Sequence, residues 1–220
     1  MIRKILIANR GEIAVRIIRA CAEMGIRSVA LYSEADRFSL HVKKADEAFS
    51  IGSDPLTGYL NVHRIVNLAV STGCDAIHPG YGFLSENPEL AAACERRGIT
   101  FIGPPAHVIK RMGDKTEARD AMKAAGLPVT PGSDSNLENI DQALELAETF
   151  GYPVMLKATS GGGGRGIRRC DSAEELQRNY DRVISEATKA FGRADIFLEQ
   201  CIVNPRHIEV QVLADNHGNA

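Results

Sequence analysis

The sequence predicts an α/β protein in which a parallel sheet with helices on both faces is followed by a second lobe. One observation is that short apolar runs alternate with amphipathic helical segments over about the first hundred residues. Another is that these helical segments end at glycines, namely Gly25, Gly73 and Gly98. Strands that alternate with helices pair in parallel, because each helix carries the chain back to the same edge of the sheet. The expected strands lie at residues 4–8, 27–32, 48–51, 76–78 and 100–102.

The first helix is expected to follow the turn at Asn9. The Asn9 side chain can cap this helix, and Glu12 would be the return half of a capping box. One helical face is apolar and carries Ile13, Ile17, Ala20, Cys21 and Met24. A second face carries Arg16, Arg19 and Glu23, which indicates either a solvated surface or an oligomer contact.

Further helices of the first lobe are expected at residues 62–72 and 88–97, the latter with Pro88 in its first turn. The loop from His78 to Asn87 leaves the carboxyl end of a strand. Ligands of parallel sheets bind at this edge, so the loop is a candidate for a binding site. We interpret His78 itself as a structural histidine rather than a catalytic one.

A helix is expected from Asp114 to Ala125, with Asp114 and Glu117 as its capping pair. Lys115 then occupies the first helical position, where a cation opposes the helix dipole. Two explanations stay open. Asp114 and Glu117 neutralise the lysine locally, or a phosphate binds where backbone donors and Lys115 both favour an anion.

The second lobe begins after residues 126–133, which are rich in glycine and proline and indicate a boundary. The expected elements are a helix at 140–150, a strand at 154–156, a second strand after the glycines, a helix to Phe191 capped by Ser172, and strands at 196–200 and 207–213. Residues 215–220 resemble a hairpin turn without a following strand, so we expect a fragment cut inside a domain.

Four consecutive glycines, Gly161 to Gly164, stand between Lys157 and Arg165. Glycine backbone N–H groups can turn inward together and form a cradle for an anion. A lysine at the end of a buried strand needs a partner for its charge, and a phosphate would supply one. The alternative is a flexible hairpin tip. A strand-like run follows the glycines and no Gly-Lys-Ser/Thr is present, so the dinucleotide and Walker A motifs are excluded.

The composition excludes several function classes. The 220 residues are 44% hydrophobic and 25% charged, with a formal net charge of −2, which favours neither nucleic acid nor an anionic membrane as a partner. No apolar run is long enough for a membrane span, and none at the start fits a signal peptide. The five cysteines are scattered and the six histidines lack metal-ligand spacing, so we expect a cytoplasmic protein without a metal site in these residues.

Over its whole length the chain resembles biotin carboxylase, the ATP-grasp component of biotin-dependent carboxylases of the acetyl-CoA or pyruvate carboxylase type. The resemblance rests on residues 7–14 (IANRGEIA), 78–87 (HPGYGFLSEN), 112–115 (MGDK), Lys157 with the glycines up to Gly166, and 204–211 (NPRHIEVQ). The chain departs from the family pattern at Ile167, usually methionine, and at Gln200, often lysine.

The resemblance implies a pre-ATP-grasp domain with a Rossmann-like sheet at residues 1–113, a linker and ATP-grasp lid at 114–203, and the truncated start of the main ATP-grasp domain at 204–220. It also implies a set of nucleotide contacts: Lys115, Lys157, Gly163, Gly164, Glu199, Gln200, Cys201, Ile202 and His207. The Arg16, Arg19 and Glu23 face would join a homodimer interface.

The chemistry implied is phosphorylation of bicarbonate by ATP to carboxyphosphate, followed by carboxylation of biotin on a carrier protein, next to a carboxyltransferase component. The family's Mg²⁺ ligands and catalytic residues would lie beyond Ala220, so we expect no catalytic residue within these 220 residues and no activity of the piece alone. Two alternatives are another ATP-grasp ligase, such as one of the carbamoyl-phosphate synthetase type, and a non-catalytic dimerisation or folding module.

Overall fold

The structure, a computed structural model, describes residues 1–159, 166–191, 195–215 and 217–220. The chain divides into two compact units, Met1–Ala118 and Arg119–Ala220. Each unit has its own sheet and its own hydrophobic core.

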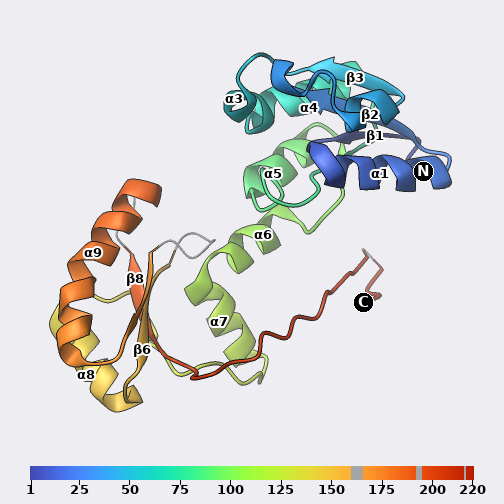
Figure 1. The fold of residues 1–220 in the computed structure, drawn as a ribbon. Coiled ribbons are helices and arrows are strands. Elements are labelled where there is room, and N and C mark those ends of the chain that lie inside the picture. The colour runs from blue at the N-terminus through green and yellow to red at the C-terminus, as the bar shows by residue number, and fades with distance from the viewer. Residues whose placement is uncertain (160–165, 192–194, 216) are drawn as a thin grey trace. The chain divides into compact units, whose positions relative to one another are not determined.

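The first unit is built on a five-stranded sheet in the order β3-β2-β1-β4-β5. Strands β1, β2 and β3 of this sheet are labelled in Figure 1. All four strand pairs are parallel. The strands are β1 (Lys4–Ile7), β2 (Arg27–Tyr32), β3 (Glu47–Ser50), β4 (Ala76–His78) and β5 (Thr100–Phe101). This parallel sheet confirms the predicted fold class. The strand order reverses between β1 and β4, so the loops that leave these two strands meet at the switch point of the sheet.

Helices cover both faces of this sheet because side chains alternate along its strands. Ile5 and Ile7 of β1 pack against α1 on one face, whereas Leu6 and Ala8 pack in the larger cluster on the other. The helices of the unit are α1 (Gly11–Glu23), α2 (Leu40–Lys44), α3 (Pro55–Tyr59), α4 (Val62–Ser71), α5 (Pro88–Arg96) and α6 (Ala106–Gly113), with a 3-10 turn η1 (Glu34–Asp36). The sequence patterns did not predict α2, α3, α6 or η1, which are too short to show helical periodicity.

The capping box predicted for α1 is wrong. The N-cap is Arg10, and no side chain caps the helix. Asn9 is instead buried and donates from Nδ2 to the carbonyl oxygens of Pro79 and Tyr81, each at 2.8 Å. Glu12 accepts a hydrogen bond from the Tyr81 hydroxyl. Both residues therefore bond to the loop after β4, because hydrogen-bond partners in that distant segment compete successfully with the local helix end.

The apolar face predicted for α1 is right in part. Ile17 and Cys21 are buried, but Met24 is 73% exposed at the end of the helix. Val15 and Ile18, which the predicted face left out, are buried. The buried surface of α1 is therefore wider than one helical stripe, because α2 packs against it as well as the sheet.

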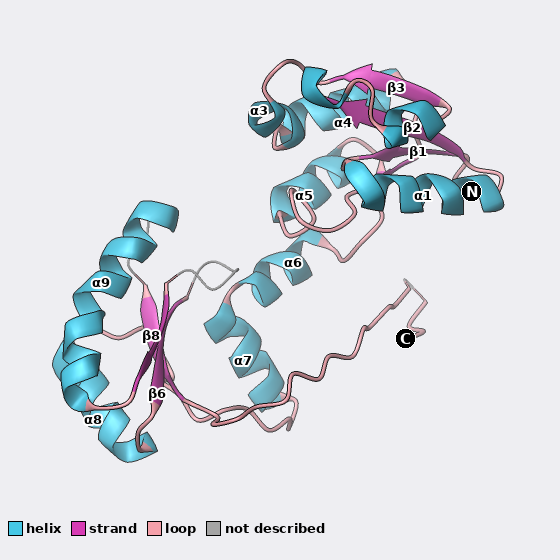
Figure 2. Ribbon diagram, in the orientation of Figure 1, coloured by secondary structure: helices cyan, strands magenta, loops and turns pink. Residues whose placement is uncertain are grey.

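The second unit holds a three-stranded antiparallel sheet in the order β7-β6-β8. Its elements are α7 (Lys115–Ala124, which begins in the first unit), α8 (Ile140–Phe150), β6 (Val154–Ala158), β7 (Ile167–Cys170), α9 (Ala173–Phe191) and β8 (Ile196–Gln200). Helices α8 and α9 lie together on one face of the sheet (Figure 2). These elements follow the predicted ones closely.

The strand predicted at residues 207–213 is absent from the structure, which shows neither helix nor strand there. Its alternating apolar side chains are exposed: Ile208, Val210, Val212 and Leu213 are 70–85% exposed. A strand needs a neighbour for its backbone groups, and no described segment pairs with this one.

Among the described residues, none of the helices combines the length and the apolar character that a membrane crossing requires.

Candidate functional site

A pocket of about 260 Å³ lies in the second unit at the ends of β6 and β8. Its lining comes from two strands and from the segments on either side of them: Thr130, Met155, Lys157, Glu199, Gln200, Cys201, Ile202 and Pro205. A cavity of this size is smaller than the ~300–1,000 Å³ typical of sites for whole drug-sized ligands. It therefore has room for a planar base or a comparable group.

The charged part of the pocket is an ion pair between Lys157 and Glu199. Their side chains are only 23% and 17% exposed. In the antiparallel register Lys157 lies opposite Phe197 and Met155 opposite Glu199, so the two charged residues are diagonal neighbours on one face. A half-buried charge is costly without a partner, which explains the pairing. An ammonium group has three donors, so Lys157 can bind an anion while it contacts Glu199.

The backbone beyond Glu199 is held from two sides. The Gln200 N–H donates to the Pro131 carbonyl at 2.8 Å, and the Cys201 N–H donates to the Pro153 carbonyl at 2.9 Å. The side-chain Nε2 of Gln200 donates to the Phe150 carbonyl at the end of α8, at 2.8 Å. The departure from the family pattern at position 200 thus has a structural role within this unit.

The structure brings part of the predicted set together. Lys157, Glu199, Gln200, Cys201 and Ile202 all line the one pocket. The predicted Gly163 and Gly164 lie outside the described residues.

Two other predicted residues lie elsewhere. Lys115 begins helix α7, whose first N–H groups, those of Thr116 and Glu117, donate to Asp114 Oδ1. His207 is exposed, with its Nε2 3.7 Å from Glu209.

Sequence reasoning missed three lining residues, namely Thr130, Met155 and Pro205. Met155 could have been found, because it is two residues before Lys157 on a strand and therefore shares its face. Thr130 could not, since only the fold brings residues 130–133 beside β8.

The first unit presents the charged face of α1 that the sequence indicated. Arg16, Arg19 and Glu23 are all exposed. The two arginines also line an open pocket of about 560 Å³ with residues of the α2 region. Within the described residues, no cluster of His, Cys, Asp or Glu side chains is arranged to hold a metal ion.

His78 of β4 accepts a hydrogen bond at Nδ1 from the Gly80 N–H, at 3.0 Å. Burial lowers the pKa of His78, which keeps the ring neutral and able to accept this bond. The geometry agrees with the structural role expected for it.

Two family models match the chain, and together they cover nearly all of it. The model described as "Biotin carboxylase, N-terminal domain" matches residues 1–109. The model described as "Carbamoyl-phosphate synthase L chain, ATP binding domain" matches residues 114–220.

Curated relatives are similar over the whole chain. It is 57% identical to the 2-oxoglutarate carboxylase small subunit of Hydrogenobacter thermophilus, covering 100% of this chain and 46% of that protein. It is 56% identical to biotin carboxylase 1 of Bacillus subtilis (100% and 49%) and 52% identical to mitochondrial pyruvate carboxylase of Mus musculus (99% and 19%). The chain thus spans about half the length of the bacterial relatives.

Solved structures agree. The biotin carboxylase domain dimer of the Hydrogenobacter thermophilus enzyme, in complex with MgADP, ADP and bicarbonate, matches with a TM-score of 0.89 and 56% identity, covering 93% of this chain and 45% of that one. A biotin carboxylase β,γ-ATP complex from Campylobacter jejuni matches with a TM-score of 0.96 and 47% identity, covering 100% and 49%.

Proposed function

The chain belongs to the biotin carboxylase family, and we propose that it supplies part of the nucleotide site of an enzyme that carboxylates carrier-bound biotin with ATP and bicarbonate. The observation that supports this most directly is the pocket in which Lys157, Glu199 and the strand end after it converge. The lysine can meet a phosphate. The carboxylate, and backbone groups at residues 200–202 other than the bonded N–H groups of Gln200 and Cys201, can hydrogen-bond the edge of a base. Met155 and Ile202 offer apolar surface to its face.

The pocket is too small for a whole nucleotide, so the sugar and phosphates need other contacts. We assign phosphate contacts to Lys115, Gly163 and Gly164, and a place beside the nucleotide to His207, as the family resemblance implies. Phosphoryl transfer depends on positioning and charge neutralisation more than on covalent help from the protein. Lysine side chains and glycine N–H groups supply the positive field that this requires.

The reaction proposed is phosphorylation of bicarbonate by ATP, giving ADP and carboxyphosphate. Carboxyphosphate breaks down to phosphate and carbon dioxide, and the carbon dioxide carboxylates the ureido nitrogen of biotin, whose proton passes to a base. Mg²⁺ would neutralise charge on the phosphates, and we assign its carboxylate ligands to the part of the relatives that these 220 residues do not span. The residues for bicarbonate and proton transfer are assigned there too. The 220-residue chain alone should therefore show no bicarbonate-dependent ATP hydrolysis, and detectable hydrolysis by the purified chain would contradict this.

The proposed partners follow from the same assignment. They are a biotin carboxyl carrier protein or domain, a carboxyltransferase component, and a second copy of the protein that docks through the Arg16, Arg19 and Glu23 face. We place the protein in the cytoplasm. Because one matching family model is named for carbamoyl-phosphate synthase, the competing function is a ligase of that type, and biotin-dependent ATPase activity of the full-length protein distinguishes the two.

Lys157→Ala in the full-length protein should raise the Kd for ADP at least about tenfold, because a charge-assisted hydrogen bond contributes about 1.5–3 kcal/mol. Isothermal titration measures this, and thermal unfolding checks that the variant folds. Lys123→Ala is the matched control, since the Lys123 side chain is 62% exposed and forms its ion pair with the exposed Asp134, at 3.4 Å. Equal ADP affinities in the parent and Lys157→Ala, or none in either, would favour a folding or dimerisation module instead.

A further inference from the structure

Helix α7 is joined to the sheet of the second unit by the side chain of Arg119. Its Nη1 donates to the Ser133 carbonyl at 2.8 Å, and its Nη2 donates to the Gly132 carbonyl at 3.2 Å. Its Nε is buried and has no hydrogen-bond partner among the described residues. A planar guanidinium can reach two successive carbonyls at once, which a lysine ammonium at one point cannot do as well.

The carbonyls that Arg119 holds belong to residues 131–133, here called the edge segment, which runs along the free edge of β8. Pro131 accepts the N–H of Gln200, and Gly132 forms an antiparallel bridge with Glu199. Ser133 donates its N–H to the Leu198 carbonyl at 2.8 Å, and its hydroxyl accepts the Leu198 N–H at 3.2 Å. The edge segment thus pairs with the part of β8 that carries Glu199 and Gln200 into the pocket.

The space around Gly132, between the edge segment, β8 and Arg119, is too small for a side chain. A Cβ added there would lie 2.8 Å from the Leu198 carbonyl oxygen, 3.0 Å from Glu199 Cγ and 3.2 Å from Arg119 Nη1. The backbone of Gly132 is therefore close both to the Arg119 guanidinium and to the Glu199 side chain. Thr130, the residue before the edge segment, is itself part of the pocket wall.

We propose that Arg119 is a positioning residue for the nucleotide site: it fixes the edge segment against β8 and so sets the place of Glu199 and of the pocket wall at Thr130. This rests on the proposed function, in that the pocket binds the base of ATP. Arg119 is not among the residues that line the pocket, so it acts on nucleotide binding through Glu199 and Thr130.

The test uses the full-length protein with Arg119→Met, which removes the donors but keeps an apolar side chain, and Arg119→Lys, which keeps the charge. Arg119→Met should raise the Kd for ADP and the KM for ATP about tenfold, because small displacements of positioned groups are costly. The KM for bicarbonate should stay within about twofold, and Arg119→Lys should fall between parent and Arg119→Met. A general loss of folding would not produce this split.

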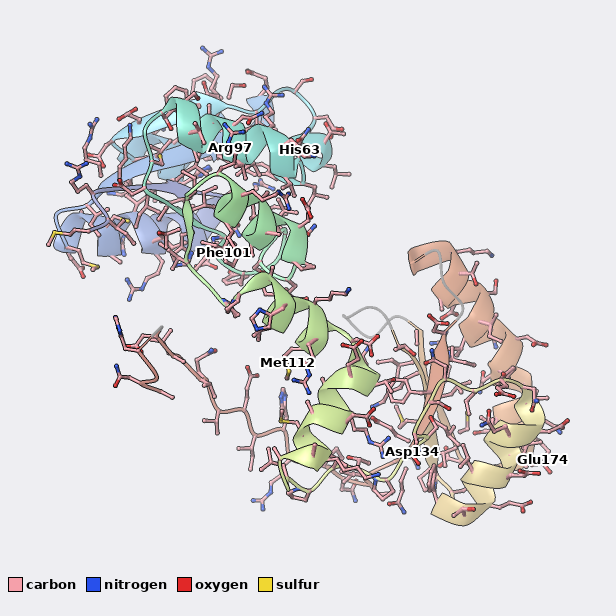
Figure 3. The ribbon with its side chains drawn as sticks, turned by 180° about the vertical axis from the view of Figure 1, so that it is seen from behind. His63, Arg97, Phe101, Met112, Asp134 and Glu174 are labelled. Atoms are coloured by element: carbon pink, nitrogen blue, oxygen red, sulfur yellow. The ribbon has the colours of Figure 1, made fainter. Side chains whose placement is uncertain are left out.

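Lys123→Met is the matched control, because Lys123 also links α7 to the residues after the edge segment. Its partner Asp134, labelled in Figure 3, directly follows Ser133. Exposed ion pairs contribute little to stability, so ADP affinity should stay within about twofold of the parent.

A second measurement does not depend on nucleotide binding. The amide N–H groups of Ser133 and Gln200 donate hydrogen bonds between the edge segment and β8. Hydrogen exchange at both should therefore be about tenfold faster in Arg119→Met, with α9 amides unchanged.

Parent-like exchange and parent-like ADP affinity in a folded Arg119→Met would overturn the proposal. If Arg119→Met does not fold, Arg119→Lys must show the same two effects, or the proposal fails. If the parent binds no ADP while exchange still accelerates, the proposed function fails and the bracing of the edge segment by Arg119 stands.

Discussion

The buried side-chain amide of Asn9 links the loop after β1 to the loop after β4 at the switch point of the parallel sheet. It is 3% exposed and is bonded on both sides, to the Arg10 N–H at Oδ1 and to the Pro79 and Tyr81 carbonyls at Nδ2. A buried amide whose N–H donors lack hydrogen bonds destabilises the fold by the free energy of desolvating those donors. The 79–81 turn therefore has to come close to Asn9, and Gly80 permits this approach. A Cβ on Gly80 would lie 2.8 Å from Asn9 Nδ2.

Gly80→Ala should destabilise the first unit by about 1–3 kcal/mol more than Gly82→Ala, because only the first substitution overpacks the Asn9 contact. The two glycines are closely matched, with φ of +66° and +65°, and only Gly80 has neighbours within 4 Å of the added Cβ. Both alanines incur the left-handed backbone cost of about 1–2 kcal/mol. Urea denaturation followed by circular dichroism measures the difference. Equal losses of stability in the two variants would show that Asn9 moves aside for the added Cβ without destabilising the fold.

For single residues, the sequence predicted which side chains need a polar or charged partner better than it predicted which residue supplies that partner. Lys157 was predicted to bind an anion because a charge at the end of an apolar strand needs a partner, whereas the role of Glu199 followed only from the family resemblance. Asn9 was assigned to the wrong partner, because its acceptors lie 70 and 72 residues away. A local capping signal cannot report such long-range acceptors.

Among the elements, the short helix α2 depends on a buried histidine. His41 is 1% exposed, and its Nε2 lies 3.1 Å from the Leu31 carbonyl of β2, whereas its Nδ1 has no hydrogen-bond partner in the part of the chain that the structure describes. The carbonyl can only accept, so Nε2 carries a proton. Burial lowers the pKa of His41 more than the Leu31 carbonyl and Asp36 raise it.

The stability of the first unit should therefore fall as the pH drops from about 7.5 to about 5.5, through the ordinary histidine pKa of about 6.5. The sign follows because the unfolded chain takes up the proton first, while the folded ring resists it, so the stabilisation is fully present above the unfolded pKa and is lost below it. Burial lowers the pKa of His78 too, and it adds to the same trend.

The control is His41→Gln, whose amide can still donate to Leu31 but cannot titrate. Its unfolding free energy, measured by urea denaturation at several pH values, should change less steeply with pH than that of the parent. An equally steep dependence in His41→Gln would contradict the role given to His41.

Long periodic elements such as α8 and α9 could be predicted from sequence, because their apolar spacing is repeated over several turns. Short ones such as α2 and α3 could not, and their existence depends on tertiary packing. The edge segment was interpreted only as a boundary rich in glycine and proline, yet Gly132 is required there by close backbone contact with β8. Residues 207–213 show the opposite error. Apolar and polar residues alternate there as in a strand, but no described strand pairs with this segment.

At the scale of the whole molecule, the charged face of α1 bears on association. Arg16 and Arg19 stand one turn apart and are exposed, with Glu12 and Glu23 on the same helix. A related biotin carboxylase domain was solved as a dimer. The net charge of −2 is too small to drive or prevent association by itself, so any effect of charge must be local to an interface.

Reversing both charges, with Arg16→Glu and Arg19→Glu, should raise the Kd of the dimer at least about a hundredfold, since like charges brought together at an interface cost several kcal/mol. Sedimentation velocity of the full-length protein at physiological salt measures this. The control is Arg178→Glu with Arg182→Glu on α9, which makes the same charge change on another exposed helix face and should leave the Kd within about threefold. If both double variants weakened the dimer equally, the cause would be net charge. A dimer unaffected by the α1 change would place the contact on another surface.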